Sequence, residues 1–196
     1  MKSAVEIIEN VCEALAANRP VEAEQILREH DPFIPIKKTK SNISCKNKVE
    51  TFLRDGFVDR YSNERLIFPG TLLLISNKLS ESFPYHPNWK MSECHMAYWK
   101  LYPTVDHIVP IARGGKNDET NWITTSQLRN SAKANWKIDE LNWKKYRIEE
   151  INKWDGMTRW FLDLIDRDKS PLATPAMREW YNVAAKFRDH PLLANS

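Results

Sequence analysis

The stretch YPTVDHIVPIARGGKNDETNWITTSQLRNSAKANW, residues 102–136, decides the fold of this chain. Val105–Val109 and Asn121–Thr125 are rich in β-branched residues, which favours two short strands. Between them Gly114-Gly115 marks a turn, because glycine accepts backbone angles that other residues avoid. Ser126 is a good helix N-cap and begins a helical pattern. The stretch therefore predicts the order strand, loop, strand, helix.

Asp106 and His107 are neighbours in the first predicted strand. Adjacent side chains of a strand point to opposite faces, but a strand that ends and bends at His107 can still aim both at one cleft. A neutral imidazole can take a proton from water around neutral pH, and a carboxylate is a ligand that hard divalent cations prefer. Hydrolysis of a phosphodiester needs both a base for the water and positive charge beside the phosphate.

Two asparagines complete the candidate site. The predicted helix places Asn130 about one turn in, where its carbonyl oxygen can approach Asp106 and complete a two-ligand metal site. Asn121 begins the second predicted strand, opposite the loop. Its amide can hold loop carbonyls there and so fix the orientation of His107.

These residues resemble the HNH branch of the His-Me finger nucleases. The spacing matches the family pattern, with fourteen residues from His107 to Asn121 and nine more to Asn130. The resemblance covers roughly residues 50–137. It implies that His107 is the general base, that Asp106 and Asn130 are metal ligands, and that Asn121 is the structural middle residue of the catalytic motif. The residues that carry the resemblance are Asp106, His107, Ile108, Pro110, Gly114, Gly115, Asn121, Asn130 and Lys133.

The family implies a metal-dependent endonuclease with a ββα-metal core that hydrolyses DNA and leaves a 5′-phosphate and a 3′-hydroxyl. Mg²⁺ is the expected cofactor, with Mn²⁺ or another divalent ion as a substitute, in a restriction, phage-defence or mobile-element setting. Two alternatives stay open: a nuclease that acts on RNA or structured nucleic acid, and a DNA-binding module that kept the fold without turnover. Intact Asp106, His107 and Asn130 argue against the binding module.

The zinc ligands of many family members are missing. At the four cysteine positions of the zinc-stapled relatives, this sequence has Asp59, Ser62, Ser126 and Arg129. No structural zinc is therefore expected. An ion pair between Asp59 and Arg129, with hydrogen bonds from the two serines, is predicted to replace it. In the alternative interpretation, Arg129 contacts a DNA phosphate and Asp59 is exposed.

The charged residues are unevenly distributed, although the formal net charge is only +3. Residues 1–31 carry a net charge of −4, and residues 36–60 carry +4. This predicts that contacts with a polyanion begin after residue 31, and the competing interpretation is a solvated surface. The candidate nucleic-acid contacts are Lys37, Lys38 and Lys40, together with Arg113, Lys116, Arg129 and Lys133 around the site.

An α+β protein with three regions is expected. Residues 1–35 predict a helical hairpin, with Val5, Ile8, Cys12 and Leu15 at helical spacing in its first helix. Residues 36–137 form the predicted nuclease core, and residues 138–196 a C-terminal helical extension. Within the core, FVDRY and ERLIF flank Ser62-Asn63 and predict a β-hairpin. The terminal helices are candidates for a homodimer contact or for a protein partner.

The composition favours a cytoplasmic protein without a membrane contact. The three cysteines form no C-x-x-C pair, which argues against a disulfide framework. The first residues include acidic side chains where a signal peptide needs an apolar core. No apolar run approaches the length of a membrane span.

Overall fold

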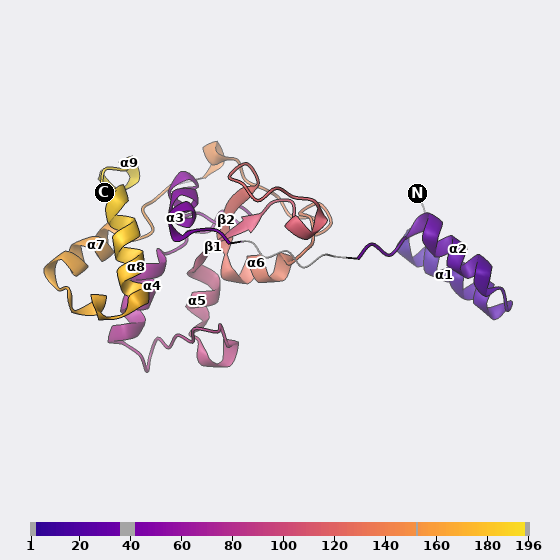
Figure 1. The fold of residues 1–196 in the computed structure, drawn as a ribbon, viewed down its shortest axis with the longest axis horizontal. Helices are drawn as coiled ribbons and strands as arrows, with labels where there is room; N and C mark the ends of the chain where they lie inside the picture. Colours follow the sequence, from indigo (N-terminus) through magenta and orange to yellow (C-terminus); the bar gives the residue numbers. More distant parts are fainter. Residues whose placement is uncertain (1–2, 36–41, 152, 195–196) are drawn as a thin grey trace. The chain divides into compact units, whose positions relative to one another are not determined.

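The computed structural model describes residues 3–35, 42–151 and 153–194. The chain divides into two compact units, residues 1–38 and residues 39–196. Each unit contains helices, and the second also contains a small sheet (Figure 1). None of the described helices is long and apolar enough to cross a membrane. The elements are α1 (Ala4–Ala16), α2 (Pro20–His30), α3 (Cys45–Arg54), α4 (Pro69–Lys78), α5 (Met96–Leu101), β1 (Pro103–His107), β2 (Trp122–Ser126), α6 (Gln127–Lys133), α7 (Thr158–Arg167), α8 (Pro175–Ala184) and α9 (Pro191–Ala194).

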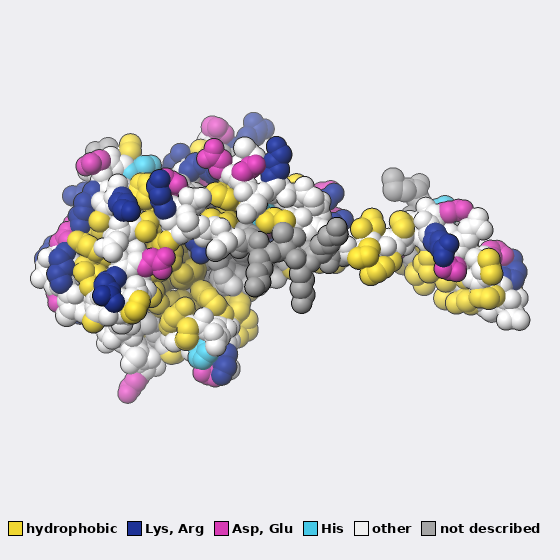
Figure 2. Space-filling view, in the orientation of Figure 1, with side chains coloured by type: hydrophobic (Ala, Val, Ile, Leu, Met, Phe, Trp, Pro, Cys, Tyr) yellow, Lys and Arg dark blue, Asp and Glu magenta, His cyan; other side chains and the backbone are white. Residues whose placement is uncertain are grey.

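The N-terminal unit is the predicted helical hairpin of α1 and α2. The two helices pack through a small buried stripe, formed by Ile7, Val11, Ala14 and Ala23. The apolar residues singled out by their spacing form a second stripe on α1, and they are exposed: Val5 by 67%, Ile8 by 49% and Leu15 by 54%. Figure 2 shows hydrophobic side chains on the surface of this unit. A role of the hairpin in dimerisation stays a prediction.

The core of the second unit is a cluster of aromatic and aliphatic side chains between helices. Helix α3 packs on α8, and α4 packs on both α7 and α8 (Figure 1). Phe68, directly before α4, contacts the rings of Phe57, Phe161 and Trp180. The helices near the C-terminus therefore pack on the same core as α3. Helix α3 also contacts β1 and β2.

The strand–loop–strand–helix order predicted for residues 102–136 is confirmed. Strands β1 and β2 pair antiparallel, with Asp106 opposite Ile123 and His107 opposite Trp122. Strand β1 begins two residues earlier than predicted and ends at His107. Helix α6 follows β2 directly, and the hydroxyl of Ser126 caps it by accepting a hydrogen bond from the backbone N–H of Arg129 at 3.3 Å. The mixture of helices with one small sheet agrees with the α+β class.

The β-hairpin predicted around Ser62-Asn63 is wrong. This segment keeps a single bridge, between Val58 and Arg65, and otherwise forms turns. Two backbone hydrogen bonds join its arms, from Asp59 to Glu64 and from Leu66 to Phe57. The N–H of Arg60 donates instead to Thr124, and the N–H of Ile67 donates to Leu101. Because these hydrogen bonds go to other segments, a regular two-stranded ladder cannot form here.

Residues 138–157 also differ from the helical extension that the sequence predicts. The described part of this segment forms turns and one short 3₁₀ helix, Ile148–Glu150. The N–H of Tyr146 donates to Arg60, and the N–H of Trp154 donates to Gly56. The segment is thus held by the turns that precede α4, and the predicted helices appear only from α7 onward.

Candidate active site

The loop between β1 and β2 is organised by the side chain of Asn121, as the sequence predicts. Its Nδ2 donates to the carbonyl oxygens of Val109 at 2.9 Å and Lys116 at 2.8 Å, and its Oδ1 accepts from the N–H of Val109 at 2.9 Å. Gly115 lies against the same carbonyl, because a Cβ there would come within 1.8 Å of the oxygen of Val109. These contacts fix the backbone that follows His107.

His107 is the last residue of β1, and its ring is held on one nitrogen. Nε2 lies 2.9 Å from Oδ1 of Asn117 in the loop and 3.2 Å from Nε1 of Trp122, its partner across the sheet. A hydrogen bond to Asn117 needs a hydrogen on Nε2, whereas the indole N–H of Trp122 can only donate and needs a lone pair there, so the two contacts belong to different tautomers of the ring. Nδ1 makes no hydrogen bond within the described part of the chain, and in the tautomer with the hydrogen on Nε2 it can accept a proton. The sequence did not single out Asn117 or Trp122.

Asp106 lies on the other face of β1 and is buried. Its Oδ2 accepts hydrogen bonds from the hydroxyl of Tyr61 at 2.7 Å and from the ammonium group of Lys133 at 2.9 Å. Burial and the neighbouring carboxylate raise the pKa of the Tyr61 phenol, so this hydroxyl remains a donor. Oδ1 has no partner among the described residues, and this oxygen is available to a ligand.

Lys133 does not occupy the position that a phosphate contact requires. Its side chain is completely buried, and its ammonium group also donates to the carbonyl oxygen of His107 at 2.8 Å. A buried ammonium group needs such partners, because an unpaired charge is costly to remove from water. The structure therefore corrects the prediction that Lys133 contacts nucleic acid. The side chain of this residue, the last of α6, instead joins the helix to the end of β1.

Asn130 stands near Asp106, across the contact between β1 and α6. Its Nδ2 donates to the hydroxyl of Thr104 at 3.1 Å, and its side-chain Oδ1 has no partner among the described residues. Thr104 and Asp106 lie two residues apart on β1, so their side chains share a face. Asn130 and Lys133 lie three residues apart on α6, so they share a face as well. Asp106 and Asn130 therefore belong to the same packed layer.

A divalent cation fits the chemistry of these two residues. The free Oδ1 of Asp106 and the carbonyl oxygen of Asn130 are hard oxygen ligands, which Mg²⁺ accepts together with water and phosphate oxygens. Within residues 3–35, 42–151 and 153–194, no group of three or more His, Cys, Asp or Glu side chains is arranged to hold a metal. Any ion at this position would thus depend on few protein ligands.

The other predicted nucleic-acid contacts have different environments. Arg113 forms an ion pair with Glu140 at 2.6 Å, and Arg129 lies 3.7 Å from Glu64. Lys116 is exposed, and its ammonium group has no ion-pair partner within the described residues. Lys37, Lys38 and Lys40 lie outside the described residues. Of the predicted contacts that the structure describes, Lys116 is thus the freest to meet a phosphate.

Asp59 ties the turn before α4 to the start of α6, at one of the places where zinc-stapled relatives have cysteine. The carboxylate is buried and accepts from the N–H of Tyr61 at 2.9 Å, the hydroxyl of Thr125 at 3.1 Å and the N–H of Ser126 at 2.9 Å. Nε of Arg129 is 3.6 Å away, an ion-pair distance beyond a good hydrogen bond. The predicted pair exists, but backbone hydrogen bonds form most of the tie.

The serines contribute differently from the prediction. Ser126 donates its backbone N–H to Asp59, while its hydroxyl caps α6. The hydroxyl of Ser62 instead contacts the exposed carboxylate of Glu64 at 2.9 Å. The alternative in which Asp59 is exposed is wrong, because that carboxylate is completely buried.

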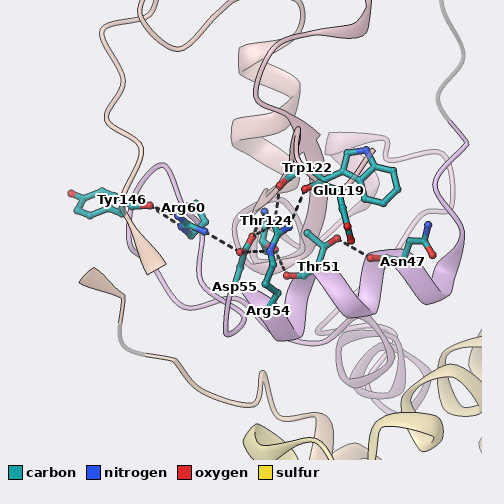
Figure 3. A network of polar contacts seen from close by, with 9 residues as sticks. All are labelled: Asn47, Thr51, Arg54, Asp55, Arg60, Glu119, Trp122, Thr124 and Tyr146. Atoms are coloured by element: carbon teal, nitrogen blue, oxygen red, sulfur yellow. Dashed lines mark hydrogen bonds and ion pairs between the residues drawn. The ribbon is translucent and has the colours of Figure 1, made fainter. Parts of the chain in front are cut away.

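A second buried carboxylate, Asp55, holds the middle of β2 (Figure 3). It accepts from the N–H of Thr124 at 2.8 Å and from the guanidinium groups of Arg60 at 2.9 Å and Arg54 at 3.0 Å. Arg54 also donates to the carbonyl oxygen of Trp122 at 2.8 Å. The network fixes the position of Trp122, and therefore of the indole that contacts His107. No periodic pattern in the sequence predicted this network.

The comparisons with known proteins agree with this local architecture. Residues 93–133 match the family model of the HNH endonucleases, which confirms the resemblance seen in the sequence. The match covers α5, β1, β2 and α6. No curated protein and no solved structure matches the chain. The HNH match indicates nuclease activity on nucleic acid.

Proposed function

We propose that this chain is an HNH endonuclease that hydrolyses DNA with the help of a divalent cation, with β1, β2 and α6 as a ββα-metal core. The observation that carries the proposal is the state of His107. This residue ends β1, its Nε2 contacts Asn117, and its Nδ1 has no partner among the described residues. An imidazole held in this way is oriented to take a proton from water.

In the proposed reaction, Nδ1 of His107 accepts a proton as water attacks the phosphorus atom. The bond from phosphorus to the 3′ oxygen breaks, which leaves a 5′-phosphate and, after protonation, a 3′-hydroxyl. Asp106 and Asn130 would hold the cation, for which Mg²⁺ is the proposed species. When bound, such a cation neutralises charge on the phosphate oxygens and stabilises the departing oxygen.

The proposed substrate is DNA, and an exposed lysine beside the loop, Lys116, supports contact with a nucleic-acid phosphate. Lys116 follows Gly115, and its backbone carbonyl is held by Asn121, so its side chain projects from a fixed loop. An exposed lysine at such a position can contact phosphate without reading a base. Arg113 can join it if a phosphate displaces Glu140, its partner on the surface.

The test compares supercoiled plasmid with single-stranded RNA, each with Mg²⁺ and with EDTA. The wild type is expected to cut the plasmid in Mg²⁺ and to be inactive in EDTA. His107→Ala should reduce the rate by about 10²–10⁴, the usual contribution of a general base. His30→Ala, which removes an exposed histidine from the N-terminal unit, is the matched control and should leave the rate unchanged.

Each other outcome has a definite meaning. Cutting of RNA alone would change the substrate and keep the catalytic assignment. Binding of plasmid without any cleavage would turn the proposal toward a binding module. Equal activity in EDTA and Mg²⁺ would rule out the divalent cation, and wild-type activity in His107→Ala would rule out the base.

A further inference from the structure

Lys133 places a buried positive charge on the carboxylate that is proposed to bind the cation. The side chain of Lys133 has no exposed surface, and that of Asp106 is 6% exposed. The ammonium group lies 2.9 Å from Oδ2 of Asp106 and 2.8 Å from the carbonyl oxygen of His107. The two charged groups interact strongly at this distance, because they are buried and little water screens them.

The charges around the site therefore cancel in the free protein. Asp106 contributes −1, Lys133 contributes +1 through its ion pair, and the amide of Asn130 is neutral. The hydroxyl of Tyr61 occupies Oδ2 as well, at 2.7 Å, so one carboxylate oxygen is doubly engaged. The affinity of a site for a hard cation depends on the number of charged ligands, and this site offers no net negative charge.

We infer that Lys133 keeps the free protein at low affinity for divalent cations, and that the phosphate of a nucleic acid supplies the missing negative charge. Cation and nucleic acid would then bind together. The inference rests on the proposed function, because it assumes that Asp106 and Asn130 are the cation ligands. It assigns Lys133 a part in setting the order of binding, in addition to its role in packing α6 against β1.

A purely structural Lys133 would behave differently. If the ammonium group only anchors the end of β1, its removal should weaken cation binding, because Asp106 would lose its support. If it competes with the cation, removal should strengthen binding to the free protein, because a nearby positive charge is gone. The two roles predict opposite signs for one measurement.

The experiment titrates Mn²⁺ into the protein without nucleic acid and follows free Mn²⁺ by electron paramagnetic resonance. Lys133→Met keeps much of the buried volume and removes the charge, and it should bind Mn²⁺ at least about tenfold more tightly than the wild type. Lys145→Met is the matched control: it removes an exposed lysine that has no ion-pair partner in the described part of the chain, and its affinity should equal that of the wild type.

A second measurement uses the wild type alone, in case circular dichroism shows that Lys133→Met does not fold. Mn²⁺ is titrated with and without a phosphorothioate duplex that resists hydrolysis, after subtraction of binding to the duplex itself. The duplex should raise the affinity of the protein by at least about tenfold, since a phosphate brings one negative charge to the site.

Unchanged or weaker affinity in a folded Lys133→Met variant would overturn the inference, and so would equal wild-type affinities with and without the duplex. The readout is cation affinity, so a failure of the cleavage assay does not decide it. Conversely, a wild type that cuts plasmid in Mg²⁺ while Lys133→Met shows no gain in affinity would keep the proposed function and remove only the inference.

Discussion

Asp59 and Asp106 are both buried aspartates beside the small sheet, but their oxygens are used differently. Both oxygens of Asp59 accept hydrogen bonds, two from backbone N–H groups and one from the hydroxyl of Thr125. Asp106 has both of its partners on Oδ2. Its Oδ1 has none within the described residues, so one of the two carboxylates is saturated and the other keeps a free ligand position.

The distribution of hydrogen-bond partners over the two oxygens therefore distinguishes a structural carboxylate from a candidate functional one. A buried carboxylate whose two oxygens both accept hydrogen bonds, here called saturated, stabilises the segments that donate to it and leaves neither oxygen without a partner. Asp55 resembles Asp59 in this respect, since it accepts from Thr124 and from two arginines. Strand β2 is thus held by two saturated carboxylates, while the end of β1 carries the incomplete one.

The largest effect is expected on activity at the incomplete carboxylate. Asp106→Asn keeps the shape and removes the charge, so cleavage in Mg²⁺ should fall by about 10²–10³, equivalent to several kcal/mol of transition-state stabilisation. Asn130→Ala should lower it less, because it removes a neutral ligand. Rates at increasing Mg²⁺ measure both effects. Wild-type rates in Asp106→Asn would show that the free oxygen has no role.

The next effect is expected on stability at the saturated carboxylate. Asp59→Ala leaves two buried N–H groups and a hydroxyl without an acceptor, which should lower the free energy of unfolding by roughly 3–5 kcal/mol. Urea denaturation measures the loss. Asp163→Ala is the matched control, because this carboxylate is exposed and should cost about 1 kcal/mol or less. Similar losses in both variants would contradict the structural role of Asp59.

A smaller effect is expected from the loop residue that holds the base. Asn117→Ala removes the acceptor for Nε2 of His107, and the misplaced ring should lower kcat by about 10–10² while KM stays the same. Asn117→Asp keeps an oxygen at this position and should recover most of the rate. Single-turnover cleavage by the two variants distinguishes a misplaced ring from a structural defect, because a structural defect would affect both variants. Equal losses in the two variants would argue against a positioning role.

The smallest effect is expected from the arginine beside Asp59. Arg129 lies 3.6 Å from the carboxylate and is 34% exposed, so Arg129→Ala should cost only about 0–1 kcal/mol of unfolding free energy. Urea denaturation beside Asp59→Ala provides the comparison. A loss as large as that of Asp59→Ala would mean that the ion pair, and not the backbone hydrogen bonds, replaces the zinc staple.

The features that the sequence predicted are local ones. Asn121 contacts the loop carbonyls five and twelve residues away, and Ser126 caps the helix that begins beside it. Turns and helix caps depend on residues that are close together in the sequence. The strand–loop–strand–helix order and the position of His107 could therefore be predicted from residues 102–136. The roles of the metal ligands and of the nucleic-acid contacts stay predictions.

The features that the sequence missed join distant segments. The two arms around Ser62 keep a single bridge, and other N–H groups there donate to Thr124 and Leu101, so strand propensity alone predicted a hairpin ladder that does not form. Lys133 was expected near a phosphate because the family that the sequence resembles often has a basic residue at this place. Its burial depends on an aspartate that comes 27 positions earlier in the chain, and no local pattern reveals that pairing.

The sequence by itself thus determined which residues form the strands, the loop and the helix, and which histidine ends the first strand. Only the tertiary structure decided which carboxylate is saturated and which remains open. Two donors to Asp59, Thr125 and Ser126, come from β2, 66 and 67 residues after it, and the hydroxyl on Asp106 comes from Tyr61, 45 residues before it. Hydrogen-bond saturation is a property of the packed neighbourhood, and it is fixed only when segments far apart in sequence meet.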